Sequence, residues 1–104
     1  MRTFIQSFAF LFCVSSSIAA EGEITSTFLK QNCLRCHGSE KQKADRRFDN
    51  LPAQIKTLDD LERYQEIVDQ LNLGLMPPED EPQPSVQERA ELIGHITKQL
   101  AMAR

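Results

Sequence analysis

The chain has 104 residues, a length that allows one small domain. Twelve Lys and Arg face fifteen Asp and Glu, and the resulting net charge of −3 argues against a nucleic-acid binder, which would normally carry a basic face. The composition is uneven along the chain, because four of the six Phe and one of the three Cys, Cys13, lie in the first twenty residues. This first segment therefore differs in kind from the rest.

Residues 1–20 have the pattern of a secretory signal peptide. Arg2 gives a positive start, residues 8–14 form an apolar run, and residues 15–20 supply small side chains suited to a signal peptidase. We expect cleavage after Ala19, or alternatively after Ala20, and we expect Cys13 to leave with the signal. An uncleaved anchor is the less favoured alternative, because a membrane span needs about 20 apolar residues. The sequence thus predicts a periplasmic or otherwise exported protein whose mature domain, residues 21–104, has no transmembrane segment.

The predicted mature domain is small and poor in aromatic residues. It keeps 84 residues and only three aromatics, Phe28, Phe48 and Tyr64, and a domain of this size is marginally stable unless something reinforces it. Disulfides are the usual reinforcement outside the cytoplasm. However, only Cys33 and Cys36 remain, and a bridge between them would close a very small loop. A large apolar ligand would supply the missing stabilisation.

Helical periodicity marks two segments in the first part of the mature chain. The first begins at Thr25, as a candidate N-cap, and runs into Cys33–His37. The second begins at a capping box of Thr57 and Asp60 and ends at Gly74. The side chains predicted to form its buried stripe are Leu58, Leu61, Tyr64, Val68, Leu71 and Leu75.

A third helix is predicted after a second capping box, formed by Ser85 and Glu88. Residues 38–56 and the proline-rich residues 76–84 are predicted loops, because proline fixes φ and removes a backbone donor. No stretch shows the sustained alternation of a strand, so the expected fold class is all-α. The predicted stripe of the third helix comprises Val86, Ala90, Ile93, Ile96 or Thr97, and Leu100.

Cys33–Leu34–Arg35–Cys36–His37 has the spacing of a c-type haem attachment sequence, C-x-x-C-H. Two thiols one helical turn apart can bond to one edge of a porphyrin, and the adjacent His can ligate the iron. The alternatives are a thioredoxin-like redox pair, a zinc site, and a simple disulfide or chance match. They are less favoured because the first needs a βαβ context and the second needs more ligands than this motif and the distant His95 offer.

Met76 is the predicted ligand on the opposite face of the iron. It lies 39 residues after His37 and directly before two prolines, which would place its thioether on a stiff loop. Ligation by His and Met raises the reduction potential of haem iron. The alternative is that Met76 only fills a gap in the core. Met102 and His95 are less favoured as ligands, and His95 is expected on the surface.

Two charged groups near these motifs are candidate contacts for a redox protein partner. Complementary charge speeds the encounter of partners more than it strengthens their binding. Arg46 or Arg47 could instead pair with haem propionates, and solvated loops are the simplest interpretation of both groups. The basic group is Lys41, Lys43, Arg46 and Arg47, and the acidic group is Glu79, Asp80 and Glu81.

Together these motifs resemble the planctomycete-type cytochrome c domain, a relative of the class I monohaem cytochromes. The resemblance is carried by residues 28–38, 41–43 and above all 76–85, and it spans roughly residues 24–100. It implies the small cytochrome c fold, with about three main helices around one covalently attached haem c. It further implies that Cys33 and Cys36 form the thioethers, that His37 is the proximal iron ligand and that Met76 is the distal one.

The expected function is that of an exported monohaem cytochrome that transfers single electrons between redox partners. It would not be an enzyme, because iron with six ligands leaves no open position for a substrate. One alternative is a haem-based sensor or interaction module, in which the distal Met yields to a gas or to a partner. Another is an electron-accepting subunit of a dehydrogenase complex.

Overall fold

The computed structural model describes residues 9–12 and 18–104. Within these ranges the chain forms helices and loops, with no strand beyond an isolated antiparallel bridge between His37 and Gln42. The fold is therefore all-α, as predicted. No helix among the described residues combines the length and the apolar character needed to cross a membrane. In chain order the elements are α1 (Ile18–Asn32), the 3₁₀-helix η1 (Lys43–Asp45), α2 (Leu58–Leu73) and α3 (Val86–Ala103).

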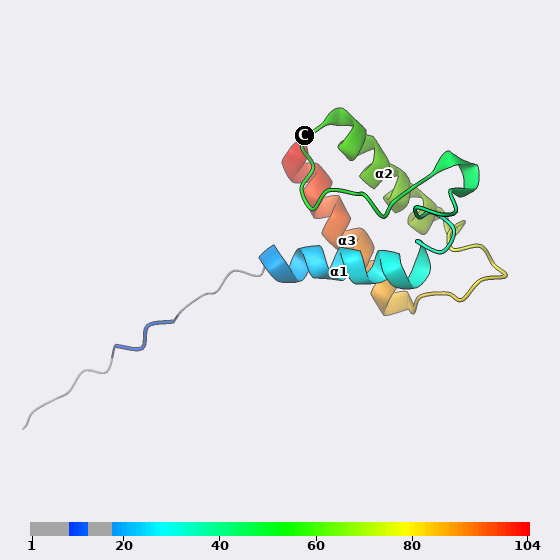
Figure 1. Ribbon diagram of the computed structural model, residues 1–104. Coiled ribbons are helices and arrows are strands. Elements are labelled where there is room, and N and C mark those ends of the chain that lie inside the picture. The colour runs from blue at the N-terminus through cyan, green and yellow to red at the C-terminus, as the bar shows by residue number, and fades with distance from the viewer. Residues whose placement is uncertain (1–8, 13–17) are drawn as a thin grey trace, which may run out of the picture.

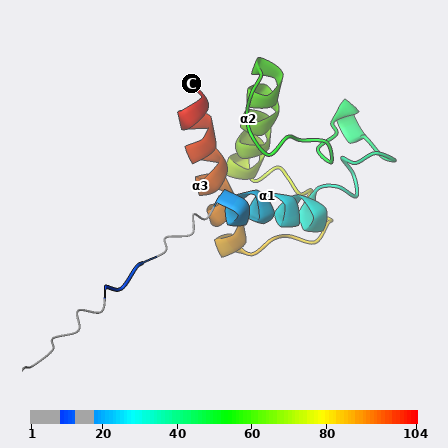
Figure 2. The same cartoon turned by 60° about the vertical axis from the view of Figure 1, so that its left-hand side comes forward.

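Helix α3 is the centre of the arrangement. It packs against α2 along much of its length and against α1 over a smaller area, and α1 runs across one end of it (Figure 1). The loop that carries η1 and the loop between α2 and α3 both project from the same side of the helices (Figures 1 and 2). Two segments distant in sequence are thereby brought to one face of the molecule.

One apolar core joins the three helices and a loop residue. Leu92 and Ile96 of α3 are its most deeply buried members, with 0% of their surface exposed. The phenol of Tyr64 is also buried, and its hydroxyl donates a 2.6 Å hydrogen bond to the carbonyl of Pro52, which holds the loop before α2 against the core. The remaining core residues are Phe28, Leu29, Phe48, Ile67, Val68, Leu71 and Leu100.

Both predicted capping boxes are present. The Thr57 hydroxyl accepts from the backbone N–H of Asp60, whose carboxylate accepts from the N–H of Thr57. Ser85 and Glu88 exchange the same pair of bonds at the start of α3. Gly74 ends α2 with φ 69° and ψ 20°, a left-handed conformation that glycine adopts without steric cost. Local sequence therefore fixes both helix starts and the end of α2.

The buried stripe of α2 is shorter than predicted. Leu58 is 71% exposed and Leu75 is 58% exposed, whereas Ile67, absent from the predicted stripe, is buried. Leu58 lies in the first turn, where no neighbouring element covers it. Leu75 follows the left-handed Gly74, so the chain has left the helical path and the periodicity no longer applies. The predicted burial of these two leucines was wrong.

The stripe of α3 is displaced in a similar way. Val86 and Ala90 are exposed, while Leu92, which the predicted stripe omitted, is fully buried beside the correctly predicted Ile96 and Leu100. The buried residues Leu92, Ile96 and Leu100 are four positions apart, so they lie on one face of α3, and this helix packs against both α1 and α2. Burial on this helix was therefore set by its two neighbours.

Helix α1 begins at Ile18, so Thr25 is not its N-cap. Thr25 lies inside the helix and is 6% exposed. The preceding segment includes Ala19, Ala20 and Glu21, which favour helix and extend it toward the N-terminus. The predicted Thr25 cap was wrong.

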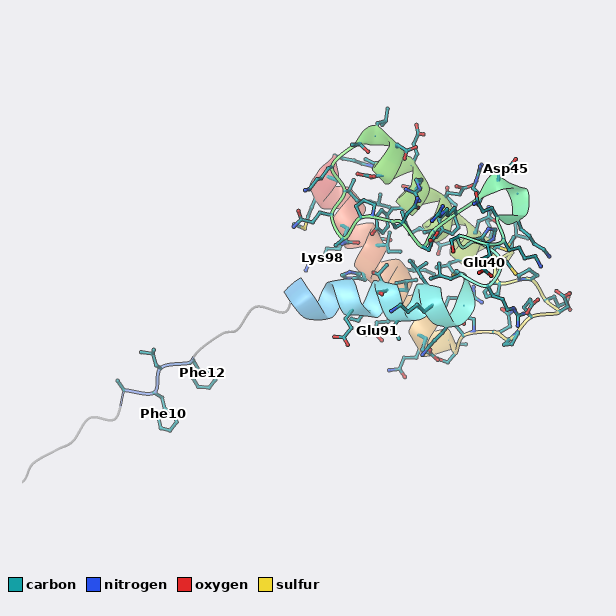
Figure 3. The ribbon with its side chains drawn as sticks, viewed as in Figure 1. Phe10, Phe12, Glu40, Asp45, Glu91 and Lys98 are labelled. Atoms are coloured by element: carbon teal, nitrogen blue, oxygen red, sulfur yellow. The ribbon has the colours of Figure 1, made fainter. Side chains whose placement is uncertain are left out.

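Most of the predicted signal segment, including Cys13, lies outside the described residues. Residues 18–20 of the segment begin α1. Residues 9–12 carry the side chains of Phe10 and Phe12 away from the helices (Figure 3), with 87% and 88% of their surfaces exposed. These two aromatic side chains take no part in the core.

Candidate functional site

A cavity of about 700 Å³ lies between the end of α1, the η1 loop, the second half of α2 and the loop after α2. Its wall is mostly apolar, and its volume falls within the range of about 300–1,000 Å³ typical of small-molecule and cofactor pockets. All four predicted site residues line it: Cys33, Cys36, His37 and Met76. The other lining residues are Lys30, Gln31, Asn32, Arg35, Lys43, Ala44, Arg46, Phe48, Glu66, Ile67, Gln70, Leu71, Pro77, Pro78, Glu81 and Pro82.

The Cys33–His37 segment forms a turn directly after α1. The N–H of Cys33 donates to the carbonyl of Leu29 at 2.8 Å, and the N–H groups of Cys36 and His37 both donate to the carbonyl of Cys33, at 3.2 and 3.0 Å. This turn places two half-buried thiols on one wall of the cavity, with the imidazole next to them. The spacing of the motif thus has the geometric result that the sequence predicted.

The alternatives to haem attachment are a redox pair, a zinc site and a disulfide, and each makes a different demand on Cys33 and Cys36. Neither thiol is in a disulfide in the described part of the chain. Burial, and secondarily the charge of Cys36, raises the pKa of the Cys33 thiol to about 11. A cysteine that acts as a redox nucleophile or binds zinc does so as a thiolate, which a lowered pKa of the thiol favours. Residues 9–12 and 18–104 also contain no cluster of three or more His, Cys, Asp or Glu able to hold a metal ion.

The imidazole of His37 is oriented by the backbone of a distant residue. Its Nδ1 lies 3.1 Å from the carbonyl oxygen of Arg46. A carbonyl oxygen can only accept, so Nδ1 carries the proton and Nε2 of the neutral ring keeps its lone pair. The ring of Phe48 lies 5.3 Å from that of His37 at 54°, and the N–H of Phe48 donates to the carbonyl of His37 at 2.8 Å. His37 is therefore held in the tautomer that a metal ligand requires.

The η1 loop turns sharply to bring the Arg46 carbonyl to His37. Ala44 and Asp45 both have positive φ, 55° and 56°, which is uncommon for residues other than glycine. The N–H of Lys43 donates to the carbonyl of Cys36 at 2.9 Å, which ties the loop to the Cys33–His37 turn. Sequence reasoning missed this support, because the acceptor is a backbone carbonyl and leaves no side-chain pattern.

Gly38 closes the motif for a steric reason. A Cβ atom at this position would lie 2.5 Å from the carbonyl oxygen of Leu34, closer than real Cβ atoms come to backbone. The N–H of Gly38 donates to the carbonyl of Lys41 at 2.8 Å, where the chain turns back toward the cavity. The structural motif therefore extends one residue beyond C-x-x-C-H.

Met76 lies on the wall formed by the loop after α2. Its side chain is 37% exposed, whereas the adjacent Pro77 is buried. Its carbonyl accepts a 3.0 Å hydrogen bond from the guanidinium of Arg89 on α3. The two alternative ligands are elsewhere: Met102 is 78% exposed near the end of α3, and His95 is half-buried, not on the open surface as predicted, and does not line the cavity.

The two arginines of the basic group identified in the sequence are paired with carboxylates. Arg46 pairs with Glu66 at 2.5 Å, and Arg47 pairs with Asp49 at 2.6 Å. Glu40 and Asp45 stand on the same loop as these arginines (Figure 3). Among the candidate propionate contacts, Arg46 lines the cavity and Arg47 does not.

One ion pair joins the two walls of the cavity. Arg35, inside the Cys–His motif, pairs with Glu81 in the loop after α2. Both residues line the cavity. The acidic group is therefore divided, since Glu81 is paired within the chain while Glu79 and Asp80 are exposed.

These donors fit a c-type haem. Cys33 and Cys36 offer thiols on the wall that also carries the imidazole of His37, and Met76 adds a thioether from a second loop. Imidazole and thioether are the axial ligands of cytochrome c iron. The mostly apolar cavity suits a large flat macrocycle.

Comparison with known families gives one match that overlaps the site. Residues 33–80 match the family described as Planctomycete cytochrome C. No match was found among curated proteins or among solved structures. The matched segment contains all four predicted site residues, confirms the resemblance inferred from the motifs and implies a haem-binding cytochrome with haem c as its cofactor. Residues 33–80 of this chain thus resemble the planctomycete cytochrome c family.

Proposed function

We propose that this protein is an exported monohaem c-type cytochrome that transfers single electrons between redox partners. Cys33 and Cys36 hold the haem covalently, His37 is the proximal iron ligand and Met76 is the distal one. The observation that carries the proposal is the hydrogen bond from His37 Nδ1 to the Arg46 carbonyl, on the wall that holds both thiols. In the neutral ring this bond places the proton on Nδ1, so that Nε2 keeps its lone pair.

Bound haem would supply a centre that gains and loses one electron. The residues of the chain hold it and limit access to it. Apolar side chains such as Ile67, Leu71 and Phe48 exclude water from the cavity wall. With His37 and Met76 both binding the iron, no position would be open for a substrate, so we assign the protein no enzymatic activity.

The partner and the compartment belong to the same proposal. Lys41 and Lys43 on one loop and Glu79 and Asp80 on the other are exposed beside the cavity. They could steer a redox protein, because complementary charge increases the rate of encounter. The high exposure of Phe10 and Phe12 supports assigning residues 1–20 to a signal that is removed on export.

The mass of the exported polypeptide tests attachment and export together. Expression of the full chain in a host that matures cytochromes should give a mass equal to residues 20–104 or 21–104 plus one haem. The matched variant with Cys33→Ala and Cys36→Ala should be exported without covalent haem. A colourless, compact and correctly processed wild-type product would contradict the proposal.

Two spectroscopic measurements test Met76. In the wild-type protein we expect a sulfur-to-iron absorption band near the red end of the visible spectrum, and Met76→Ala should abolish it. The reduced wild-type protein should bind carbon monoxide poorly, whereas Met76→Ala should bind it readily. An unchanged spectrum in Met76→Ala would defeat the assignment, and tight carbon monoxide binding by the wild type would favour a sensor.

A further inference from the structure

We propose that Arg89 is a positioning residue for Met76 and that it acts together with Gln83. Both residues lie outside the matched segment, residues 33–80. The inference rests on the proposed function, in which Met76 is the distal ligand. Arg89 and Gln83 would hold Met76 in place, because the side chain of Met76 is not packed in the core.

Met76 needs support from outside the core. Its side chain is 37% exposed, so packing alone restrains it weakly. The loop that carries it contains four prolines between residues 77 and 84. Proline has no N–H, so this loop has few backbone donors with which to satisfy its own carbonyls. Donors must come from side chains.

Arg89 donates three hydrogen bonds in this region. Its Nη1 donates to the Met76 carbonyl at 3.0 Å and to the Leu71 carbonyl at 3.4 Å, and its Nη2 donates to Oε1 of Gln83 at 3.0 Å. Arg89 thus ties α3 to the end of α2 and to the backbone of Met76 itself. A planar guanidinium can make these bonds at once, and bonds from a charged donor are stronger than neutral ones.

Gln83 supplies the other connections. Its Nε2 lies within hydrogen-bond distance of the carbonyls of Pro77 at 3.1 Å, Pro78 at 2.8 Å and Glu81 at 3.1 Å, so its two N–H groups are shared among three acceptors. Its Oε1 is in turn held by Arg89. The side chain of Glu81 pairs with Arg35 in the Cys–His motif. The connections therefore reach from α3, through the Met76 loop, to the wall that carries the thiols.

The test compares Arg89→Ala with a matched control on the same helix. Arg104 also donates to a residue of α2, Oε1 of Gln65 at 2.6 Å, but it lies at the opposite end of α3 from Arg89. Haem-loaded full-length variants are compared by the red-end absorption band, by the reduction potential and by carbon monoxide affinity in the reduced state. Arg89→Ala should weaken the band, lower the potential and raise the carbon monoxide affinity about tenfold, which corresponds to about 1.4 kcal/mol. Arg104→Ala should leave all three unchanged.

Two milder variants keep the test decisive if Arg89→Ala does not fold. Arg89→Lys retains the charge but loses the planar fork, so it should restore only part of the wild-type behaviour. Gln83→Leu removes an exposed amide and should change the band and the affinity in the same direction as Arg89→Ala.

The outcomes separate this inference from the proposed function. If Met76→Ala abolishes the band but Arg89→Ala and Gln83→Leu behave like Arg104→Ala, the positioning role is overturned while Met76 remains the ligand. If Met76→Ala leaves the spectrum unchanged, the ligand assignment fails first and the positioning role fails with it.

Discussion

His37 Nδ1 and the carbonyl oxygen of Arg46 lie 3.1 Å apart, so a backbone atom nine residues away sets the tautomer of the proposed proximal ligand. The side chain of Arg46 points to a different partner, Glu66. The two roles of this residue are therefore separable, because a side-chain substitution leaves the carbonyl in place.

Arg46→Ala is expected to preserve haem attachment and the reduction potential. It removes the exposed ion pair with Glu66, and such pairs contribute little to stability because solvent screens them. The hydrogen bond that orients His37 should persist. Potentiometry of the haem-loaded protein measures the reduction potential, and urea denaturation measures its stability. Arg47→Ala is the control, because Arg47 pairs with Asp49 and does not line the cavity. A large fall in potential in Arg46→Ala alone would show that the guanidinium also acts on the haem.

Gly38→Ala and Gly94→Ala should have opposite effects. At Gly38 the new Cβ would lie 2.5 Å from the Leu34 carbonyl oxygen, so the Cys33–His37 turn would have to shift. We expect a lower yield of haem-loaded protein. At Gly94, inside α3, nothing lies within 4 Å of the new Cβ, and replacing an exposed helical Gly with Ala should raise the free energy of unfolding by about 1 kcal/mol. Haem content per polypeptide and urea midpoints measure both, and equal haem content in the two variants would contradict the steric argument.

Sequence predicted the parts of this molecule that are set by short-range chemistry. The C-x-x-C-H spacing located the Cys33–His37 turn, and the Thr57 and Ser85 capping boxes located two helix starts, because each depends on residues within a few positions of one another. The position of Met76 directly before Pro77 and Pro78 singled it out as a site residue, and Met76 lines the cavity. Local pattern was sufficient in these cases.

The features that the sequence did not predict depend on contacts between segments that are distant in the chain. Whether Leu58 or Leu92 is buried depends on which helix lies opposite, and a single chain segment does not contain that information. The carbonyl of Arg46 and the guanidinium of Arg89 act on residues nine and thirteen positions away. A backbone acceptor is the same at every position, so no residue type marks these contacts in advance.

Leu92→Ala and Leu58→Ala test the corrected assignment of the core. Leu92 is 0% exposed between the packed helices, and truncation of such a residue should lower the free energy of unfolding by about 2–5 kcal/mol. Leu58 is 71% exposed, and its truncation should change stability by less than about 0.5 kcal/mol. Urea denaturation of the haem-loaded variants gives both values. Similar losses in the two variants would restore the predicted stripe and contradict the packing of α2.

Asp60→Asn should make the stability of the protein less dependent on acidic pH. The backbone N–H of Lys56, and after it that of Thr57, donates to the Asp60 carboxylate and lowers its pKa below the ordinary value of 3.8. A carboxyl whose folded-state pKa is lowered stabilises the fold above its ordinary pKa, and that stabilisation is lost as the pH falls through the folded-state pKa. Wild type should therefore be more stable than Asp60→Asn at pH 7, and the difference should shrink below about pH 4. Urea denaturation of the haem-loaded protein from pH 7 to pH 3 measures this. Asp59→Asn is the control, because the carboxylate of Asp59 takes no part in the capping box. A difference in stability between wild type and Asp60→Asn that does not change with pH would show that the cap acts through shape and not through charge.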